Sequence, residues 1–496
     1  MPAEAQARRG LAHKTGIAPQ VRYCFEHGRL FMHDRRDLSL YEGNRDLWEL
    51  LEALSATQSP AQALERLGRG RNGQDPALAA RFQQTLALLA QMGLVELADL
   101  PAPQPAGEAA KAGAAPRPAG RRAYSYDAFI ARISDMVRPA GSQPLARPLL
   151  VEWQLTNACN LSCFYCYHGE NKARTAGQLS TPQALSLARD LARSGVMQVT
   201  LEGGEPLLHP GLLDIVAELK NLGLQVRILT NGTRLSPDMA SALAGLLDPR
   251  ADLIQISLDG SSAAVHELSR GEGSFEPALR GLANLARAGL PCQVSMVAHQ
   301  SNLHDLKNTY LLAGRFNNVT GFMAAHYMKA GSALAMAALD KAPLLEAFHQ
   351  ARAAAWRDAS LPPATLLPGH LLHLDEVWRM CQELSNPEIR YCRAGRAKVT
   401  IDANGDVYPC HFLIYPEFKL GSLRQESLAD IWTSPRMAFI RDPRSPQAEC
   451  HRCDRGRWCG KKCMGLAYAY YRDLDRADPN CLYAARGFQA ASRAGA

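Results

Sequence analysis

Residues 159–166 read Cys-Asn-Leu-Ser-Cys-Phe-Tyr-Cys, which places three cysteines in a CxxxCxxC spacing. The apolar run at 149–155 comes just before them and predicts a buried strand. Three thiolates on a short loop after a strand suit three corners of a 4Fe-4S cluster. No fourth cysteine lies nearby, so one iron of such a cluster would be left open for another ligand. A zinc site is the alternative, because zinc also binds short cysteine motifs.

The spacing, with the aromatic Tyr165 just before the last cysteine, resembles the radical S-adenosylmethionine (SAM) superfamily. The resemblance implies that Cys159, Cys163 and Cys166 hold a cluster whose open iron is chelated by the amino and carboxylate groups of SAM. It also implies that reduction cleaves SAM to a 5′-deoxyadenosyl radical, which abstracts hydrogen from a substrate.

Composition excludes several other classes of protein. The chain has 496 residues, which is too long for one ordinary domain. Its net charge of +7 is scattered rather than clustered, so we expect no nucleic-acid partner. No apolar run long enough to span a membrane and no secretory signal is found, so we expect a cytoplasmic protein. Thirteen cysteines without a signal favour metal binding in a reducing compartment over disulfides.

From 149 to about 325, apolar strands alternate with amphipathic helices. The expected strands are 149–155, 196–202, 224–229, 253–258, 292–298 and 319–324. The expected helices are 181–194, 211–222, 237–247, 275–289 and 303–313. Six parallel-type strands with helices between them predict an α/β domain that forms a partial (β/α)6 TIM-like barrel. The active face of a barrel of this kind lies at the C-terminal ends of its strands.

Polar motifs do follow the predicted strand ends. Gly203-Gly204-Glu205-Pro206 follows the second strand, and its two glycines let the backbone approach a ligand closely. The tetrapeptide matches the GGEP motif of the superfamily, which implies that Gly203, Gly204, Glu205 and Pro206 receive the SAM ammonium group.

The resemblance points to further cofactor contacts at or after later strands. Ser257 and Asp259 match the position that contacts the ribose of SAM, and Arg270 stands where related enzymes carry an arginine near the SAM carboxylate. Tyr165 is a further candidate for cofactor contact. Two strand-end residues, Asn231 and His326, are candidates for the wall of the substrate cavity, and Asn231 is also a candidate for cofactor contact. The alternatives are a strand-end cap for Ser257 and Asp259, a solvated side chain for Arg270, and a turn-forming or core role for the other two.

Residues 20–98 have a different pattern. Apolar segments flank Glu26-His27-Gly28 and predict a hairpin, and three short helices and a closing strand at 94–97 complete a winged-helix arrangement. This region resembles the small peptide-chaperone family of pyrroloquinoline quinone (PQQ) biosynthesis. The resemblance implies recognition of the leader of a ribosomally made precursor peptide, which would add a strand to the hairpin edge. A DNA-binding winged helix or a structural cap is the alternative.

The remaining segments connect these parts. The Pro/Ala/Gly-rich stretch 99–120 predicts a solvated linker. An amphipathic helix at 121–138 is expected to open the barrel domain, 121–326. Residues 327–380 predict bridging helices before a cysteine-rich iron–sulfur domain at 381–496.

Seven cysteines lie between 392 and 481, and four of them follow the spacing Cys450-x2-Cys453-x5-Cys459-x3-Cys463. Ahead of these four, residues 402–410 predict a hairpin around Asn-Gly that presents a cysteine at its end. The arrangement resembles the SPASM domain, an extension shared by maturases of peptide antibiotics, peptide-derived cofactors and sulfatases. A zinc ribbon is the alternative for the four spaced cysteines.

The resemblance implies two auxiliary 4Fe-4S clusters, hence three clusters in all. The second auxiliary cluster would take Cys450, Cys453, Cys459 and Cys481. The first would take Cys392, Cys410 and Cys463. Two clusters need eight ligands and only seven cysteines are at hand, so the eighth ligand is Cys381, another group, or an open site. Cys24 and Cys292 lie on apolar strand patterns and are expected to be inert core residues.

Together these features predict a radical SAM oxidoreductase that modifies a precursor peptide by forming a thioether or carbon–carbon crosslink, or by a similar oxidation. Reduced flavodoxin or ferredoxin is the expected electron donor. The alternatives are a maturase that makes formylglycine in a folded protein, and a non-catalytic iron–sulfur protein that binds peptides or carries electrons.

Overall fold

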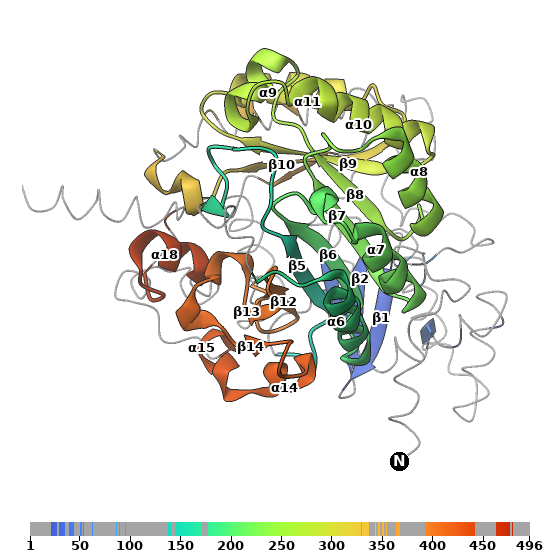
Figure 1. Ribbon diagram of the computed structural model, residues 1–496, viewed down its shortest axis with the longest axis vertical. Helices are drawn as coiled ribbons and strands as arrows, with labels where there is room; N and C mark the ends of the chain where they lie inside the picture. Colours follow the sequence, from blue (N-terminus) through green and yellow to red (C-terminus); the bar gives the residue numbers. More distant parts are fainter. Residues whose placement is uncertain are drawn as a thin grey trace, which may run out of the picture. The chain divides into compact units, whose positions relative to one another are not determined.

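The computed structural model describes residues 144–169, 177–328, 330–336, 392–441 and 463–476, the strands at 21–26, 29–34, 39–43, 137–139 and 364–367, and some single residues. The chain divides into two compact units (Figure 1), each described here by itself. One unit comprises residues 1–140 and 382–385, and the other 141–381 and 386–496.

The first unit contains an antiparallel sheet in the order β1-β2-β3-β4. Its strands are β1 (Val21–Glu26), β2 (Arg29–Asp34), β3 (Ser39–Gly43) and β4 (Val137–Pro139). The predicted β1–β2 hairpin is confirmed, and β3 was not predicted. The prediction of a helix over 121–138 is wrong at its C-terminal end, because Val137 and Arg138 belong to β4, which pairs with β3. Pro139 has no backbone N–H and suits a strand end better than a helix interior.

Only single residues are described in the helical part of this unit. Leu50, Leu51, Leu86 and Leu89 are helical and buried, and Val95 forms a β-bridge, as the sequence pattern predicts. These points agree with the expected elements, but the winged-helix fold itself stays a prediction. The linker at 99–120 lies outside the described residues.

The core of the second unit is a row of parallel strands that begins just before the cysteine loop. The strands are β5 (Leu150–Thr156), β6 (Gln198–Gly203), β7 (Gln225–Thr230), β8 (Leu253–Ser257), β9 (Cys292–Ala298) and β10 (Val319–His326). They pair in chain order, which confirms the six predicted strands. Val151, Trp153 and Leu155 alternate along β5 into the hydrophobic core, each at most 2% exposed.

Amphipathic helices follow the strands and cover the outside of the sheet (Figure 1). They are α6 (Thr181–Arg193), α7 (Leu212–Asn221), α8 (Pro237–Leu246), α10 (Phe275–Arg287) and α11 (Leu306–Ala313), all close to their predicted positions. Helix α9 (Ala263–Arg270) was not predicted. Its 8 residues make little more than two turns, too short for a clear helical period in the sequence.

The sheet continues beyond the barrel at both edges, which the sequence did not predict. Strand β11 (Ala364–Leu367) pairs with β10, so the expectation of helices throughout 327–380 is wrong at these residues. At the other edge β12 (Lys398–Ile401) runs parallel to β5, followed by β13 (Asp406–Tyr408) and β14 (Gly421–Ser422). The cysteine-rich region therefore shares one ten-stranded sheet with the barrel.

The predicted hairpin around Asn404-Gly405 is confirmed as the β12–β13 turn. The Asp402 carboxylate accepts hydrogen bonds from the N–H groups of Asn404 and Asp406, both at 2.9 Å. Gly405 has φ +86°, which favours glycine. The helices that follow are α14 (Leu428–Thr433), α15 (Ala438–Arg441) and α18 (Met464–Tyr471). Among the described residues, none of the helices combines the length and apolar character needed to cross a membrane.

Candidate active site

The three cysteines of the opening motif lie on one loop at the C-terminal end of β5. Their side chains are all partly exposed. Cys166 N–H donates to Cys163 O at 3.2 Å, and Phe164 N–H donates to Ser269 O at 3.2 Å. Cys166 O in turn accepts from Ser332 N–H at 2.9 Å. The backbone is thus fixed from three sides while the thiols stay accessible.

Gly203 and Gly204 bring the end of β6 against the start of this loop. Gly204 N–H donates to Thr156 O at 2.7 Å. A Cβ on Gly204 would stand 2.1 Å from Ala158 O, and Gly203 has φ +124°. The sequence interpretation assigned these glycines to the approach of a ligand. The structure adds a second reason, because the backbone that they approach is the chain's own cysteine loop.

Glu205 is buried, and its carboxylate joins its own turn to the end of β7. Its Oε1 accepts from Thr230 Oγ1 at 2.6 Å and Leu207 N–H at 3.1 Å, and its Oε2 accepts from Asn231 N–H at 2.8 Å. Burial raises the pKa of the Glu205 carboxyl, and these hydrogen bonds counter that effect. Pro206 begins the short 3-10 helix η3 (Pro206–Leu208) that follows.

Asn231 connects the turn after β7 to the cysteine loop. Its Nδ2 donates to Asn160 Oδ1 at 3.0 Å, and its Oδ1 accepts from Thr233 N–H at 2.9 Å. This pattern agrees with the turn-forming alternative for Asn231 and also fixes the loop residue next to Cys159. His326 ends β10, but its side chain lies outside the described residues.

Asp259 is fully buried and already surrounded by donors. Arg270 Nε donates to Asp259 Oδ2 at 2.7 Å, and Val297 N–H donates to Oδ1 at 2.9 Å. The Tyr165 hydroxyl and the Ser269 hydroxyl also donate to this carboxylate. Burial alone would raise the pKa of Asp259, but the Arg270 guanidinium and these donors hold it below its usual value. The carboxylate therefore positions Tyr165 and Arg270, both from the predicted SAM contacts.

Ser257 ends β8 and is half-buried, opposite Ser295 of β9. Arg270 lies at the end of α9 and is 6% exposed, so it is not a solvated surface arginine. Its guanidinium carbon lies 5.8 Å from the centre of the Tyr165 ring. The structure thus brings Tyr165, Asp259 and Arg270 into one cluster beside the cysteine loop.

His299 belongs to this site and was missed from the sequence. It follows β9, is 1% exposed, and neither ring nitrogen has a hydrogen-bond partner among the described residues. Its ring centre lies 5.0 Å from that of Phe164 and 6.1 Å from that of Tyr165. Burial lowers the pKa of His299, which disfavours the charged form of the imidazole. Only its position after a barrel strand end would have marked it in the sequence.

These features fit a bound SAM and iron–sulfur cluster. Thiolates are the usual ligands of such clusters, and Cys159, Cys163 and Cys166 supply three of them on one loop. The buried nitrogens of His299 lack partners that a polar ligand beside Tyr165 would supply.

A second polar group lies inside the barrel, where β5 and β6 meet β12. Lys398 Nζ is 2.6 Å from Glu152 Oε1, and His411 Nδ1 is 2.9 Å from Glu152 Oε2. Glu202 is near them, and ligand atoms of Glu152, Glu202 and His411 all lie within 4.8 Å of one another. Such a trio resembles a cation site, but Lys398 already supplies a positive charge there. The group is better described as a buried hydrogen-bonding network.

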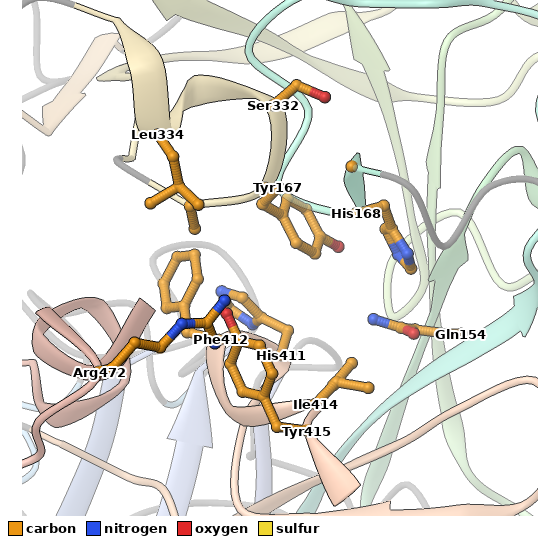
Figure 2. Close-up of a pocket in the computed structure, with 13 residues that line it drawn as sticks. Gln154, Tyr167, His168, Ser332, Leu334, His411, Phe412, Ile414, Tyr415 and Arg472 are labelled. Carbon is orange, nitrogen blue, oxygen red and sulfur yellow. The ribbon is translucent and has the colours of Figure 1, made fainter. Parts of the chain in front are cut away.

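A cavity of about 370 Å³ adjoins this network (Figure 2). Gln154 and Tyr167 line it from the barrel side, and His411, Tyr415 and Arg472 line it from the cysteine-rich region. Figure 2 shows Arg472 beside Phe412 and Tyr415, with Gln154 and His168 across the cavity. The cavity thus has the aromatic rings of Tyr167, Phe412 and Tyr415 in its wall, with the Arg472 guanidinium at one side and the Gln154 amide and His168 imidazole opposite.

Three of the predicted auxiliary ligands fall within the described residues. Cys392 is exposed, Cys410 is buried, and Cys463 caps the start of α18 by accepting from Leu466 N–H. A Cβ on Gly465 would stand 3.2 Å from Cys410 Sγ, so Cys410 lies against the beginning of that helix. The other predicted or candidate ligands lie outside the described residues: Cys381, Cys450, Cys453, Cys459 and Cys481.

Cys292 is separate from these groups. It is fully buried on β9, and burial raises its pKa to about 12, which agrees with the predicted inert core role. The side chain of Cys24, for which the sequence predicted the same role, lies outside the described residues.

Comparison with known families gives two matches to separate parts of the chain. A profile of the radical SAM superfamily matches residues 153–313, and a profile of the SPASM iron–sulfur cluster-binding domain matches residues 392–454.

Individual relatives align over about two thirds of the chain. Mycofactocin maturase of Mycobacterium ulcerans is 31% identical over 347 residues, which cover 68% of this chain and 89% of the relative. An AdoMet-dependent heme synthase of Methanosarcina barkeri is 27% identical, and the alignment covers 68% of this chain and 97% of the relative. PqqA peptide cyclase of Methylorubrum populi is 29% identical, with 69% of this chain and 87% of the relative covered.

Among solved structures, SuiB of Streptococcus suis bound to its precursor peptide SuiA has a similar fold. The TM-score is 0.63 at 16% identity, with 94% of this chain and 99% of that chain covered. This similarity extends beyond the barrel to most of the chain.

Proposed function

The chain belongs to the radical SAM superfamily, among the peptide-modifying maturases that carry a SPASM domain, and from this premise we propose that it crosslinks or otherwise oxidises a ribosomally made precursor peptide. The product proposed is a thioether, a carbon–carbon crosslink or a similar oxidation. The observation that carries the proposal is the single loop that presents Cys159, Cys163 and Cys166 beside the buried GGEP turn.

In this proposal the loop cysteines hold the SAM-binding cluster. When bound, SAM and the cluster supply a radical that takes a hydrogen atom from the peptide, and the protein positions and shields the reacting groups. The sequence resemblance assigns these residues to the SAM site: Tyr165, Gly203, Gly204, Glu205, Pro206, Asn231, Ser257, Asp259 and Arg270.

The structure leads us to change this set of residues in two ways. The Asp259 carboxylate accepts from Arg270, Tyr165, Ser269 and Val297, so we assign it to positioning rather than to direct ribose contact. The ring nitrogens of His299 have no hydrogen-bond partner in the described part of the chain and lie beside Tyr165, so we add His299 as a direct contact.

Two auxiliary clusters complete the proposed set of three. Cys392, Cys410 and Cys463 would hold the first, with Cys381, another group or an open site in the fourth position. The second would take Cys450, Cys453, Cys459 and Cys481. Reduced flavodoxin or ferredoxin is the proposed electron donor. The parallel pairing of β12 with β5 supports electron transfer between the barrel and the auxiliary region, because it fixes one beside the other.

The N-terminal unit is proposed to bind the leader of the precursor peptide. Strand β1 is at the edge of its antiparallel sheet, and an edge strand offers free backbone groups to an added strand. The domain boundaries proposed are those of the sequence pattern: 20–98 for recognition, 99–120 for the linker, 121–326 for the barrel, 327–380 for the bridge and 381–496 for the SPASM region. Strand β4 is an exception, because it pairs with β3 and belongs to the first unit.

The test is co-expression with each short open reading frame found near the gene, as a candidate precursor, followed by mass spectrometry of the peptide. A mass loss of two hydrogens per crosslink, absent with the Cys159→Ala variant, is the expected result. An unchanged peptide beside active SAM cleavage would overturn the peptide-maturase proposal and favour a non-peptide substrate, such as that of the heme synthase relative.

A further inference from the structure

Within the described residues, Glu202 is the carboxyl of the buried network whose oxygens form no direct ion pair, although His411 lies nearby. Lys398 and His411 both pair with Glu152, which accepts from Thr400 Oγ1 as well. Glu202 is 8% exposed, and its Oε1 has no hydrogen-bond partner among the described residues. The Tyr167 hydroxyl is hydrogen-bonded to the same carboxyl group.

Gln154 supplies a matching donor on the neighbouring strand. It is 2% exposed, and its Nε2 likewise has no partner within the described part of the chain. Gln154 and Glu202 are direct partners in the β5–β6 register, so their side chains leave the sheet side by side on the same face. Gln154 also lines the cavity between the barrel and the cysteine-rich region (Figure 2).

Within the described residues, the Gln154 Nε2 donor and the Glu202 Oε1 acceptor lie on neighbouring strands without partners. These two atoms determine which chemical group can bind between them. The group must accept a hydrogen bond from Gln154 and donate one to Glu202. A hydroxyl or a carboxamide does both well, whereas a thiol is weak in both roles. Buried polar atoms without partners are costly, so a ligand that satisfies both is favoured.

Resting on the proposed function, we propose that Gln154, which lines the cavity, and its register partner Glu202 form a binding site for a hydroxyl or amide group of the precursor peptide, and that Glu202 takes a proton from that group. The O–H or N–H bond breaks, its electron pair stays on the peptide oxygen or nitrogen, and the proton binds Glu202 Oε1. The carboxylate becomes a carboxylic acid, and no oxidant is needed for this step.

The electrostatics of the site suit this role. Burial, and then the negative charge of Glu152, raise the pKa of Glu202 to about 7, against the opposing effects of His411, Lys398 and the Tyr167 hydrogen bond. A carboxyl with a pKa near neutrality accepts and releases protons at a physiological pH. These are the titratable groups that face Glu202 from β5, β12, the 3-10 turn η6 (His411–Leu413) and the cysteine loop.

The experiment uses the reconstituted full-length enzyme, SAM, a reductant and the precursor peptide that the co-expression test identifies. Modified peptide and 5′-deoxyadenosine are both measured between about pH 5.5 and about pH 8.5. For the wild type, modified peptide should decline below a midpoint of about 7, because Glu202 becomes protonated. Glu202→Gln should form at least about 100-fold less modified peptide, while 5′-deoxyadenosine still accumulates. The decline of product at low pH, the acid limb of the profile, should be absent in this variant.

Glu218→Gln is the matched control, because Glu218 is on the outer helix α7 and pairs with Arg189 far from the cavity. Gln154→Leu provides a second test: peptide affinity should fall about tenfold while the acid limb is kept. Wild-type product yield and an unchanged pH profile in Glu202→Gln would overturn the proposal, as would unchanged peptide affinity in Gln154→Leu. Absence of 5′-deoxyadenosine in the wild type would instead overturn the proposed function itself.

Discussion

Lys398 Nζ on β12 lies 2.6 Å from Glu152 Oε1 on β5, and this ion pair joins residues 246 positions apart in the sequence. It crosses the seam where the cysteine-rich region adds its strands to the barrel sheet. His411, next to Cys410, binds the other oxygen of the same carboxylate. The pair therefore helps to fix a predicted cluster ligand relative to the barrel.

Removal of this lysine should be costly. Burial alone would raise the pKa of Glu152, but Lys398 and His411 outweigh it and hold that pKa well below its usual range. Lys398→Met leaves a buried carboxylate with less compensation and should lower the free energy of unfolding by about 3 kcal/mol. Urea denaturation followed by tryptophan fluorescence measures the change.

The control for this prediction is Lys419→Met. Lys419 pairs with Asp406 at the same distance of 2.6 Å, but its side chain is 41% exposed. An exposed pair contributes about 0.5 kcal/mol or less. Equal losses from the two lysine variants would contradict the importance given to the buried seam.

Gly204→Ala should disrupt the cofactor site. Its Cβ would stand 2.1 Å from Ala158 O, so the β6 end and the cysteine loop must separate. We expect SAM binding, measured by equilibrium dialysis, to weaken at least about tenfold because the contacting loops shift. Gly245→Ala is the control, since nothing lies within 4 Å of a Cβ at that position in α8. Wild-type affinity in Gly204→Ala would show that this close approach is not required.

Asp259→Asn should reveal an acid-dependent contribution to stability. The pKa of Asp259 in the folded protein lies below its usual value of 3.8, so the ionised form favours folding. The contribution is complete above about pH 5 and is lost as the pH falls through the folded-state pKa. The difference in unfolding free energy between wild type and variant should be about 3 kcal/mol at neutral pH and should shrink on acidification. A difference that is constant with pH would contradict the assigned ion pair with Arg270.

His299→Phe tests the residue that sequence reasoning missed. The aromatic contacts with Phe164 and Tyr165 are kept, but both ring nitrogens are lost. SAM affinity should fall about tenfold, as expected for one lost hydrogen bond, with the visible absorption of the cluster unchanged. His304→Phe, at an exposed position, serves as the control. Unaltered SAM affinity would remove His299 from the site.

Much of the barrel could be predicted from the sequence because its strands are buried and its helices are amphipathic. The six strands and the helices between them follow such patterns, and the hairpin at Asn404-Gly405 follows a local turn preference. The pairing of β12 with β5 depends on contacts between distant residues, which no local pattern records. Strand β11 is 4 residues long and follows two prolines, so its pairing with β10 had no clear signal either.

The candidate site was likewise predictable where it consists of contiguous motifs, and not where it depends on contacts between distant residues. Cys159, Cys163, Cys166 and the GGEP turn are contiguous motifs and were found from the sequence. The roles of Asp259 and His299 depend on which atoms surround them, so the sequence suggested ribose contact for the first and nothing for the second. The cavity walls come from both ends of the second unit, and only the three-dimensional structure brings Gln154 and Arg472 together.

The central claim is that the loop of Cys159, Cys163 and Cys166 holds the cluster that cleaves SAM. The most direct measurement is 5′-deoxyadenosine release by the reconstituted, reduced enzyme, for the wild type, Cys166→Ala and Cys292→Ala. We predict release by the wild type and by Cys292→Ala, whose cysteine is buried on β9 away from the loop, and none above background by Cys166→Ala. No release by the wild type, or undiminished release by Cys166→Ala, would contradict the claim.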